Sequence, residues 1–432
     1  MQDTLSPQAA EDVFGDPSST PIAPVAASKR IETLDFIRGI AVMGILWANI
    51  VAFGQPMLAY FTPGKFLVPT GDPDGWMWIV QFILIDGKMR GLFTVLFGAG
   101  MVLFMEKAWA RGATRWLQAW RLVLLLGFGL IHFYFIWFGD ILSGYAILGL
   151  IALLCMKWRP RTQLWVGLAG YMLGMVFYAF LIFPWLIVST DLGTSTPEFA
   201  EMRTGMVAQM QEQLAAQEPV NAAIASGDYA ALVAHRIGEE GLDPFSNAFL
   251  FGFETLPLML IGMALYSLGF FSGGIERAKL VRWGWIGVIA GGAAHLAIGL
   301  AVQADGFSFF GTQAAFLGMS GLPRLWMVLG LAALLVAHAP SATGWLGERV
   351  RGAGRAAFTN YLGTSIVMMF VFHGWALGLF GQLNRPQLYV VVVLAWIVML
   401  AWSKPWLDRF NYGPLEWLWR CLTYRRVFPL RK

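Results

Sequence analysis

Two residues suited to acid–base chemistry, His132 and Asp140, lie in one apolar stretch, RLVLLLGFGLIHFYFIWFGDILSGYAILG, residues 121–149. An ionisable side chain at membrane depth is a functional candidate, and histidine is the side chain best suited to proton transfer near neutral pH. We therefore expect His132 to be a general base that Asp140 orients. Two structural alternatives stay open: a histidine hydrogen-bonded between packed helices, and an aspartate that caps the next helix.

A polar stripe follows one face of the stretch from Arg30 to Gly54. At about 100° per helical residue, Arg38 and Asn49 point in directions roughly 20° apart and lie roughly 16 Å from each other along the helix axis. Asp35 lies within about 60° of both. Because lipid cannot solvate such a face, we expect it to line a protein cavity. A membrane-entry anchor is the alternative explanation.

Two further apolar stretches carry charges that are candidates for substrate binding. Arg90 follows Asp86 and Lys88 in IDGKMRGLFTVLFGAG, and these charges suggest a site for an anionic group, although interfacial solvation explains them as well. Glu254 is the only carboxylate well inside NAFLFGFETLPLMLIGMAL. Pro257 nearby should kink that helix and free a backbone carbonyl.

The composition indicates what must hold these residues in place. Of the 432 residues, 57% are hydrophobic and only 13% are charged, whereas soluble domains carry about 25% charged residues. The apolar stretches are about 20 residues long, which suits helices rather than barrel strands. The sequence therefore predicts an all-α, polytopic integral membrane protein.

We predict ten membrane-spanning helices, and eleven or twelve if short apolar segments also cross. The ten are at 35–54, 88–106, 117–138, 140–156, 163–189, 247–271, 283–303, 323–339, 356–381 and 386–404. Residues 75–86 are expected to form a short interfacial or re-entrant helix, and residues 307–321 are a similar short segment. Residues 190–246, acidic and helix-forming, are expected to form an extracytoplasmic cap of one or two helices.

These features divide the chain into five predicted parts. They are a disordered tail at 1–29, an N-terminal bundle at 30–189, the cap at 190–246, a C-terminal bundle at 247–426 and a basic tail at 427–432.

Basic residues predict the orientation in the membrane. One set of loops is rich in them: Lys107, Arg111, Arg115, Lys157, Arg159, Arg161, Arg277, Lys279, Arg282, Arg349, Arg351 and Arg355. The opposite side holds few. By the positive-inside rule, both termini are in the cytoplasm. The aromatic, basic segment WLDRFNYGPLEWLWRCLTYRR suits the inner-leaflet interface, where membrane lipids are its expected partners.

Several other chemistries find no support in the sequence. No HExxH, paired-cysteine zinc spacing, nucleotide-binding loop or GxSxG occurs, and the two cysteines, Cys155 and Cys421, lie far apart. We therefore predict no metal site and no bound cofactor. The net charge of +4 follows from the basic loops and needs no nucleic-acid partner.

Several motifs in order resemble the bacterial YeiB-type membrane proteins. They are RIETLDFIRGIAVMGILWANI, RGLFTVLFGAGM, GLIH with GDILSGYA, and then GRAAFTNYLGTSI and FNYGPLEWLWRCLTYR, which look like that family's C-terminal domain of unknown function. The resemblance covers nearly all of residues 30–426 except the cap. It implies a multi-pass protein of the bacterial cytoplasmic (inner) membrane.

The N-terminal half is similar, more distantly, to the heparan-α-glucosaminide N-acetyltransferase domain and the wider transmembrane acyltransferase group. Those proteins begin with an Asp-x-x-Arg-Gly helix followed by an Asn, which Asp35, Arg38, Gly39 and Asn49 match. The resemblance implies acyl transfer from cytosolic acyl-CoA to an acceptor across the membrane. The acetyltransferase carries its proposed catalytic histidine shortly after the first helix, but residues 55–85 here contain none. Either His132 takes that role or the activity differs.

The leading hypothesis is thus a membrane acyltransferase-like protein with a lipid or glycan acceptor. In it His132 is the base, Asp140 orients it, and Asn49 orients the acyl carbonyl or stabilises its oxyanion. Arg38 and Arg90 hold anionic groups. A proton-coupled transporter or lipid flippase that uses His132 and Glu254 as a relay is the alternative, and a non-catalytic membrane scaffold is a third.

Overall fold

The computed structural model describes residues 32–71, 73–188 and 196–432. Within these ranges every regular element is helical, and the only β-type pairing is an isolated bridge between Phe410 and Arg431. The predicted all-α class is therefore confirmed. The predicted disordered tail at 1–29 lies outside the described residues.

The helices of the first half run from the polar stripe to the long helix that precedes the cap. They are α2 (Glu32–Gly54), α3 (Met57–Phe61), α4 (Pro73–Leu84), α5 (Lys88–Trp109), α6 (Arg115–Ile131), the π-helical turn η3 (His132–Ile136), α7 (Leu142–Leu154) and α8 (Pro160–Val188).

The second half begins with the cap helices α10 (Pro197–Ser226) and α11 (Tyr229–Gly238). The helices that follow are α12 (Asp243–Ser267), α13 (Arg277–Ala304), α14 (Phe309–Ala314), the π-helical turn η5 (Ala315–Met319), α15 (Gly321–His338), α16 (Trp345–Arg355), α17 (Ala357–Phe372), α18 (Arg385–Arg409) and α19 (Pro414–Tyr424).

Eight helical segments of the described chain are long and apolar enough to cross a membrane. Two shorter apolar helices, Leu142–Leu154 and Ala357–Phe372, occupy the remaining two predicted positions. Each of the ten predicted spans therefore contains an apolar helix, and the count of ten crossings stays a prediction. The predicted short helix at 75–86 is α4, and residues 307–321 form α14 and η5.

Glycines allow the central helices to approach at backbone distance. A Cβ atom on Gly98 of α5 would lie 2.1 Å from the Met259 carbonyl oxygen of α12, and one on Gly262 of α12 would lie 2.0 Å from the Val95 carbonyl oxygen. These reciprocal contacts fix α5 against α12, because only glycine lets two helices pack so closely. Helix α2 likewise packs against α16, α17 and α18. The helices of the two predicted bundles therefore interdigitate in one core, while the division itself stays a prediction.

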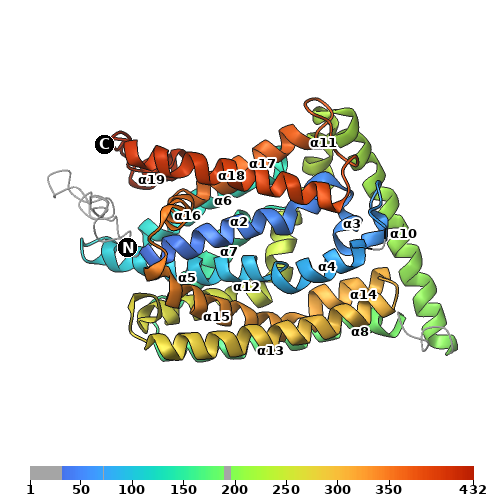
Figure 1. The fold of residues 1–432 in the computed structure, drawn as a ribbon, viewed down its shortest axis with the longest axis horizontal. Coiled ribbons are helices and arrows are strands. Elements are labelled where there is room, and N and C mark those ends of the chain that lie inside the picture. The colour runs from blue at the N-terminus through green and yellow to red at the C-terminus, as the bar shows by residue number, and fades with distance from the viewer. Residues whose placement is uncertain (1–31, 72, 189–195) are drawn as a thin grey trace, which may run out of the picture.

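The two ends of the bundle differ in what covers them. Helix α19 and the start of α2 lie at one end, and the cap helices α10 and α11 lie at the opposite end (Figure 1). The cap reaches back to the π-helical turn, since Tyr229 Oη of α11 donates to the Phe135 carbonyl at 2.6 Å, and Tyr134 Oη donates to the Gly241 carbonyl at 2.6 Å. This arrangement agrees with the two predicted sides, and the assignment of the α19 end to the cytoplasm stays a prediction.

Candidate functional site

His132 and Asp140 are in direct contact in the interior of the bundle. The Nδ1 atom of His132 lies 2.9 Å from Asp140 Oδ1, and neither side chain is exposed. A carboxylate accepts from an imidazole N–H, so this contact selects the tautomer with the proton on Nδ1. Nε2 then carries the lone pair, which is the arrangement that a general base requires.

The local backbone explains how residues eight positions apart meet. Helix α6 ends at Ile131, and residues His132–Ile136 form a π-helical turn that closes with the Trp137 N–H donating to the His132 carbonyl at 2.7 Å. Such turns break the regular α-helical register and are frequent at functional sites. Asp140 also accepts from the Ser143 backbone N–H at 2.7 Å, in the first turn of α7. Asp140 therefore contacts both His132 and the first turn of α7, and its orienting role stays a prediction.

The second ring nitrogen of His132 has no partner in the part of the chain that the structure describes. Nε2 is buried and lacks a hydrogen bond among the described residues. The Tyr361 ring of α17 lies 5.2 Å from the imidazole, and the Trp137 ring lies 6.3 Å away. A buried polar atom without a partner costs stability, so Nε2 is a candidate for contact with a bound molecule.

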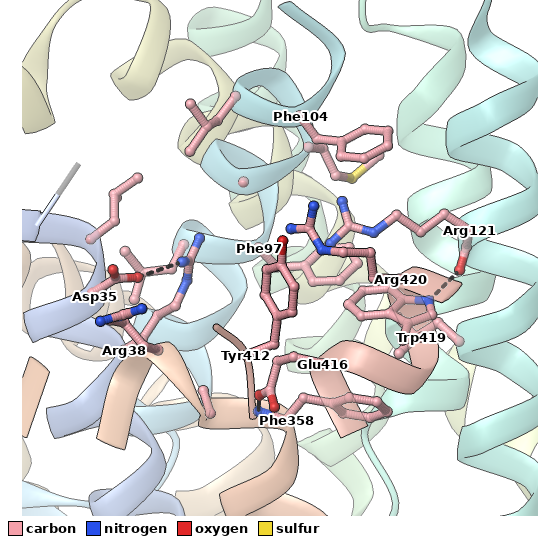
Figure 2. Close-up of a pocket in the computed structure, with 18 of the residues that line it drawn as sticks. Asp35, Arg38, Phe97, Phe104, Arg121, Phe358, Tyr412, Glu416, Trp419 and Arg420 are labelled. Atoms are coloured by element: carbon pink, nitrogen blue, oxygen red, sulfur yellow. Dashed lines mark hydrogen bonds and ion pairs between the residues drawn. The ribbon is translucent and has the colours of Figure 1, made fainter. Parts of the chain in front are cut away.

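A large cavity of the described chain opens at the α19 end. It has a volume of about 590 Å³ and lies between α2, α5, α6, α17 and α19 (Figure 2). Six cationic side chains line it against two carboxylates. The cations are Arg38, Lys107, Arg111, Arg121, Arg355 and Arg420, and the carboxylates are Asp35 and Glu416. A cavity with such a charge excess favours an anionic ligand.

Aromatic rings hold two of these arginines in place. The Arg121 guanidinium lies 4.4 Å from the Phe104 ring centroid and 4.1 Å from that of Trp419, and the Arg420 guanidinium lies 4.5 Å from the Tyr412 ring (Figure 2). Stacked arginines keep their N–H edges available for phosphate while their flat faces are shielded. The wall formed by α6 and α19 is thus rigid, cationic and aromatic.

The inner end of the cavity approaches the buried histidine. Leu122 and Leu125 of α6 line the cavity, and His132 lies two helical turns beyond Leu125 on the same face. Tyr361 also lines the cavity and contacts His132. Its hydroxyl accepts from the Ile141 N–H at 3.3 Å. Tyr361 therefore stands between the cavity and the His132–Asp140 pair.

Asp35 and Arg38 line the same cavity from the start of α2. Arg38 Nη1 donates to Asp35 Oδ1 at 3.2 Å, within one helical turn. Asp35 is buried, and 22% of the Arg38 side chain is exposed. The inner half of the predicted polar stripe therefore faces a protein cavity.

Asn49 lies at the other end of the stripe and is absent from the lining of that cavity, as far as the described residues define it. It is half-buried. Phe53, one turn further on the same face, stacks on Trp137 with ring centroids 4.1 Å apart. This contact places the outer half of α2 beside the π-helical turn that carries His132.

Arg90 and Glu254 form a separate ion-pair cluster, which Arg324 completes. Glu254 Oε2 accepts from Arg90 Nη2 at 2.7 Å and from Arg324 Nη1 at 2.9 Å. The cluster joins α5, α12 and α15, and none of its members lines the large cavity. It is linked to that cavity by Tyr145, a lining residue whose hydroxyl donates to the Arg90 carbonyl at 3.2 Å.

Comparison with known proteins places this architecture in a family. Residues 265–426 match the family described as "Protein of unknown function (DUF418)". The chain is 30% identical to "Uncharacterized protein YeiB" of Escherichia coli (strain K12) over 408 residues, which cover 93% of this chain and 98% of that protein. The chain belongs to the YeiB family. It is also 29% identical to "Uncharacterized protein YxaH" of Bacillus subtilis (strain 168), with 95% and 98% of the two chains covered. No solved structure matches.

In this YeiB-family chain, six of the seven predicted site residues form three pairs, and the seventh lies apart from them. Asp35 and Arg38 line the cationic cavity, His132 and Asp140 form the buried pair, and Arg90 and Glu254 belong to the ion-pair cluster. Asn49 lies between the first two groups along α2. The roles given to these residues stay predictions.

The sequence did not predict that the C-terminal segment lines the cavity. Tyr412, Glu416, Trp419 and Arg420 of WLDRFNYGPLEWLWRCLTYRR line the cavity, and the predicted place of this segment at the membrane interface stays a prediction. Arg121 was also missed, although a lone arginine within the apolar stretch 117–138 is a signal of an internal cationic site. Arg324, the second partner of Glu254, sits 70 residues away and carries no local signal.

Glu416 joins the cavity wall to α17. Its Oε1 accepts from the Phe358 and Thr359 backbone N–H groups at 2.8 and 3.1 Å, and its Oε2 accepts from Thr359 Oγ1 at 2.5 Å. A carboxylate here caps the first turn of α17 and complements its dipole. Burial raises the pKa of Glu416 above its ordinary value of 4.5, and the hydrogen bonds from Thr359 and Phe358 offset part of that rise.

Proposed function

We propose that this YeiB-family membrane protein transfers an acyl group from a cytosolic thioester donor to an acceptor that reaches the His132–Asp140 pair. The observation that carries the proposal is a buried histidine with an unpartnered Nε2 at the inner end of a cationic cavity. A scaffold has no use for either feature, because both cost stability.

The cavity suits a polyanionic donor such as acyl-CoA. Its cations and shielded arginine faces can bind several phosphate oxygens. The inner wall is apolar and aromatic, with Phe93, Phe97 and Leu125 as members, and suits an acyl chain. Lys107 and Phe93 of α5 both line the cavity, and their 14-residue separation spans roughly 21 Å of helix. A donor held at Lys107 can thus extend deep into the bundle.

The proposed reaction uses the tautomer that Asp140 selects. His132 Nε2 removes the proton from the acceptor hydroxyl or amine, and the acceptor oxygen or nitrogen attacks the thioester carbonyl carbon. The tetrahedral intermediate collapses, the carbon–sulfur bond breaks, and the thiolate leaves with the proton returned by His132. Asn49 orients the acyl carbonyl or stabilises its oxyanion through its side-chain amide. Tyr361 turns aside in the reactive state, which opens the cavity to Nε2.

The ion-pair cluster favours a second candidate, a proton-coupled transporter or lipid flippase. Buried charges on three helices are typical of transport pathways. However, two guanidinium groups bind the same oxygen of Glu254, which suits a fixed ion pair better than a proton carrier. Acyl transfer is therefore the leading proposal.

The deciding experiment incubates the purified protein, in nanodiscs of bacterial lipid, with acyl-CoA that carries a label in the acyl group. Acyl transfer predicts release of free CoA together with labelled lipid or glycan. No CoA release, combined with pH-gradient-dependent uptake of a lipid or solute into proteoliposomes, would refute acyl transfer and support the transporter.

A further inference from the structure

We propose that Arg90 is the binding residue of a second, outer subsite that takes an oxyanion, the phosphate or carboxylate of an amphiphile. Under the proposed function this group belongs to the acceptor, and that assignment rests on the proposed function. The site itself rests on the charge, exposure and bonding of the Arg90–Glu254–Arg324 cluster.

The cluster contains two arginines and one carboxylate, so it has a net charge of +1. Two arginines share a single carboxylate oxygen, Glu254 Oε2, and the other oxygen, Oε1, is buried without a partner in the described chain. Other buried charges nearby offset each other in two couples: Asp86 with Lys88, two residues along the chain, and Asp74 with its ion-pair partner Arg385. An excess cation at membrane depth is costly unless an anion joins it.

The two arginines are not equivalent, and only Arg90 is available to a ligand. Arg324 is 7% exposed and donates to Glu254, to the Phe316 carbonyl at 2.5 Å and to Ser320 Oγ at 2.6 Å. Arg90 has one hydrogen bond among the described residues, from Nη2 to Glu254, and 27% of its side chain is exposed. Arg324 thus fixes Glu254, and Glu254 fixes Arg90.

The Arg90 side chain is partly covered by an aromatic ring and partly accessible. The Phe251 ring lies 5.1 Å from Arg90 Cζ and covers part of the guanidinium. A planar guanidinium presents a fork of donors that matches phosphate and carboxylate oxygens. The geometry therefore suits an oxyanion better than a sugar or an amine.

The subsite lies next to the inner end of the large cavity. Arg90 shares one face of α5 with Phe93 and Phe97, which line the cavity, at spacings of three and seven residues. Tyr145, which lines the cavity, bonds to the Arg90 carbonyl at 3.2 Å and to Thr94 Oγ1 at 2.7 Å. An anionic acceptor bound at Arg90 therefore has its remaining length near the donor.

The test measures ligand-dependent thermal stabilisation of the full chain in dodecyl maltoside micelles, because that detergent carries no phosphate or carboxylate. Two probes are titrated separately: inorganic phosphate in the buffer and phosphatidylglycerol in the micelles. Stabilisation by phosphate identifies a free anion as sufficient, and stabilisation by phosphatidylglycerol alone identifies a lipid headgroup. Either result supports the subsite if it depends on Arg90.

Four variants make the dependence specific. Arg90→Gln should weaken the apparent affinity for the effective probe at least about tenfold, which is the loss expected for a charged hydrogen bond. Arg90→Lys should keep part of it. Glu254→Gln should tighten binding, because a competing carboxylate is removed. Arg203→Gln, an exposed arginine on α10, is the matched control and should change nothing.

Arg90→Gln should fold, whereas Glu254→Gln, which leaves two guanidinium groups without their carboxylate, should unfold at a lower temperature before any ligand is added. Arg90→Gln leaves Glu254 paired with Arg324, so it does not strand a buried charge. The opposite signs expected for Arg90→Gln and Glu254→Gln separate ligand binding from a purely structural role. No stabilisation of the parent by either probe, or equal stabilisation of Arg90→Gln and Arg203→Gln, would overturn the subsite. The assay contains no acyl donor, so its failure and the failure of acyl transfer are distinguishable.

Discussion

Replacing Glu416 with Ala should detach the cavity wall from α17. The substitution removes three hydrogen bonds, to the Phe358 N–H, the Thr359 N–H and Thr359 Oγ1. A hydrogen bond to a charged group contributes about 1.5–3 kcal/mol, and an N-cap about 1 kcal/mol. Because the three bonds share one carboxylate and it is costly to bury, their effects do not add. We expect a local loss of about 2–3 kcal/mol.

Hydrogen exchange at the Phe358 and Thr359 amides measures this loss directly. A change of about 2–3 kcal/mol corresponds to protection that falls roughly 30- to 150-fold. Glu416→Gln should retain more protection than Glu416→Ala, since it keeps an acceptor and buries no charge. Glu348→Ala is the control: the Glu348 side chain is 51% exposed and 3.7 Å from Lys404. That exposed pair should contribute at most about 0.5 kcal/mol.

The pH dependence of the same contact has a definite sign. Because burial raises the pKa of Glu416 above 4.5, the docked segment binds a proton more tightly than the undocked one. The contribution of Glu416 to docking is therefore largest below pH 4.5 and declines as the pH rises through the raised value. Glu416→Gln should lack this decline. Unchanged protection of both amides in Glu416→Ala would refute the assigned capping role.

Three further predictions follow from the site and the core. Asp140→Asn places an amide opposite His132 Nδ1 and favours the wrong histidine tautomer. Turnover per folded molecule should therefore fall by up to about 10⁴-fold with little change in stability. A loss of only a few-fold would contradict the pairing role. Arg121→Gln should weaken CoA binding about tenfold or more and reduce the salt dependence of that binding, as measured by titration calorimetry. Substitution of the exposed Arg282 by Gln should leave both the affinity and its salt dependence unchanged. Gly98→Ala forces a Cβ against the Met259 carbonyl and should lower the free energy of unfolding by about 1–3 kcal/mol. Gly292→Ala, where a Cβ meets nothing within 4 Å, should be neutral or stabilising. Equal effects of the two substitutions would contradict the close α5–α12 packing.

Local features of the sequence predicted much of the fold. Apolar length placed a helix at each of the ten predicted spans, because a helix in a bilayer satisfies its own backbone hydrogen bonds and is decided locally. The proximity of His132 to Asp140 was also accessible, since eight residues and one turn separate them. Local patterns did not reveal the π-helical turn, which depends on the register forced by Trp137 and the cap.

Contacts between distant segments account for what the sequence did not reveal. The cavity needs α19 to fold back on α5 and α6, but an aromatic, basic helix is equally suited to the membrane surface. The sequence identified Glu254 as a carboxylate inside an apolar stretch. It did not identify the partner, because Arg324 lies on another helix at the start of a different apolar stretch. Hydropathy alone does not say which helices are neighbours, so partners across the bundle stay hidden.

Turnover of His132→Ala per folded molecule tests the central claim most directly. The parent and the variant are purified into the same nanodiscs, their folded fractions are matched by thermal unfolding, and release of free CoA from acyl-CoA is followed. A general base predicts a rate loss of about 10²–10⁴-fold with the folded fraction preserved. A histidine that only joins helices predicts a stability loss of roughly 0.6 kcal/mol, at most about 1.7 kcal/mol, with turnover within a few-fold of the parent. That second result would contradict acyl transfer at the His132–Asp140 pair.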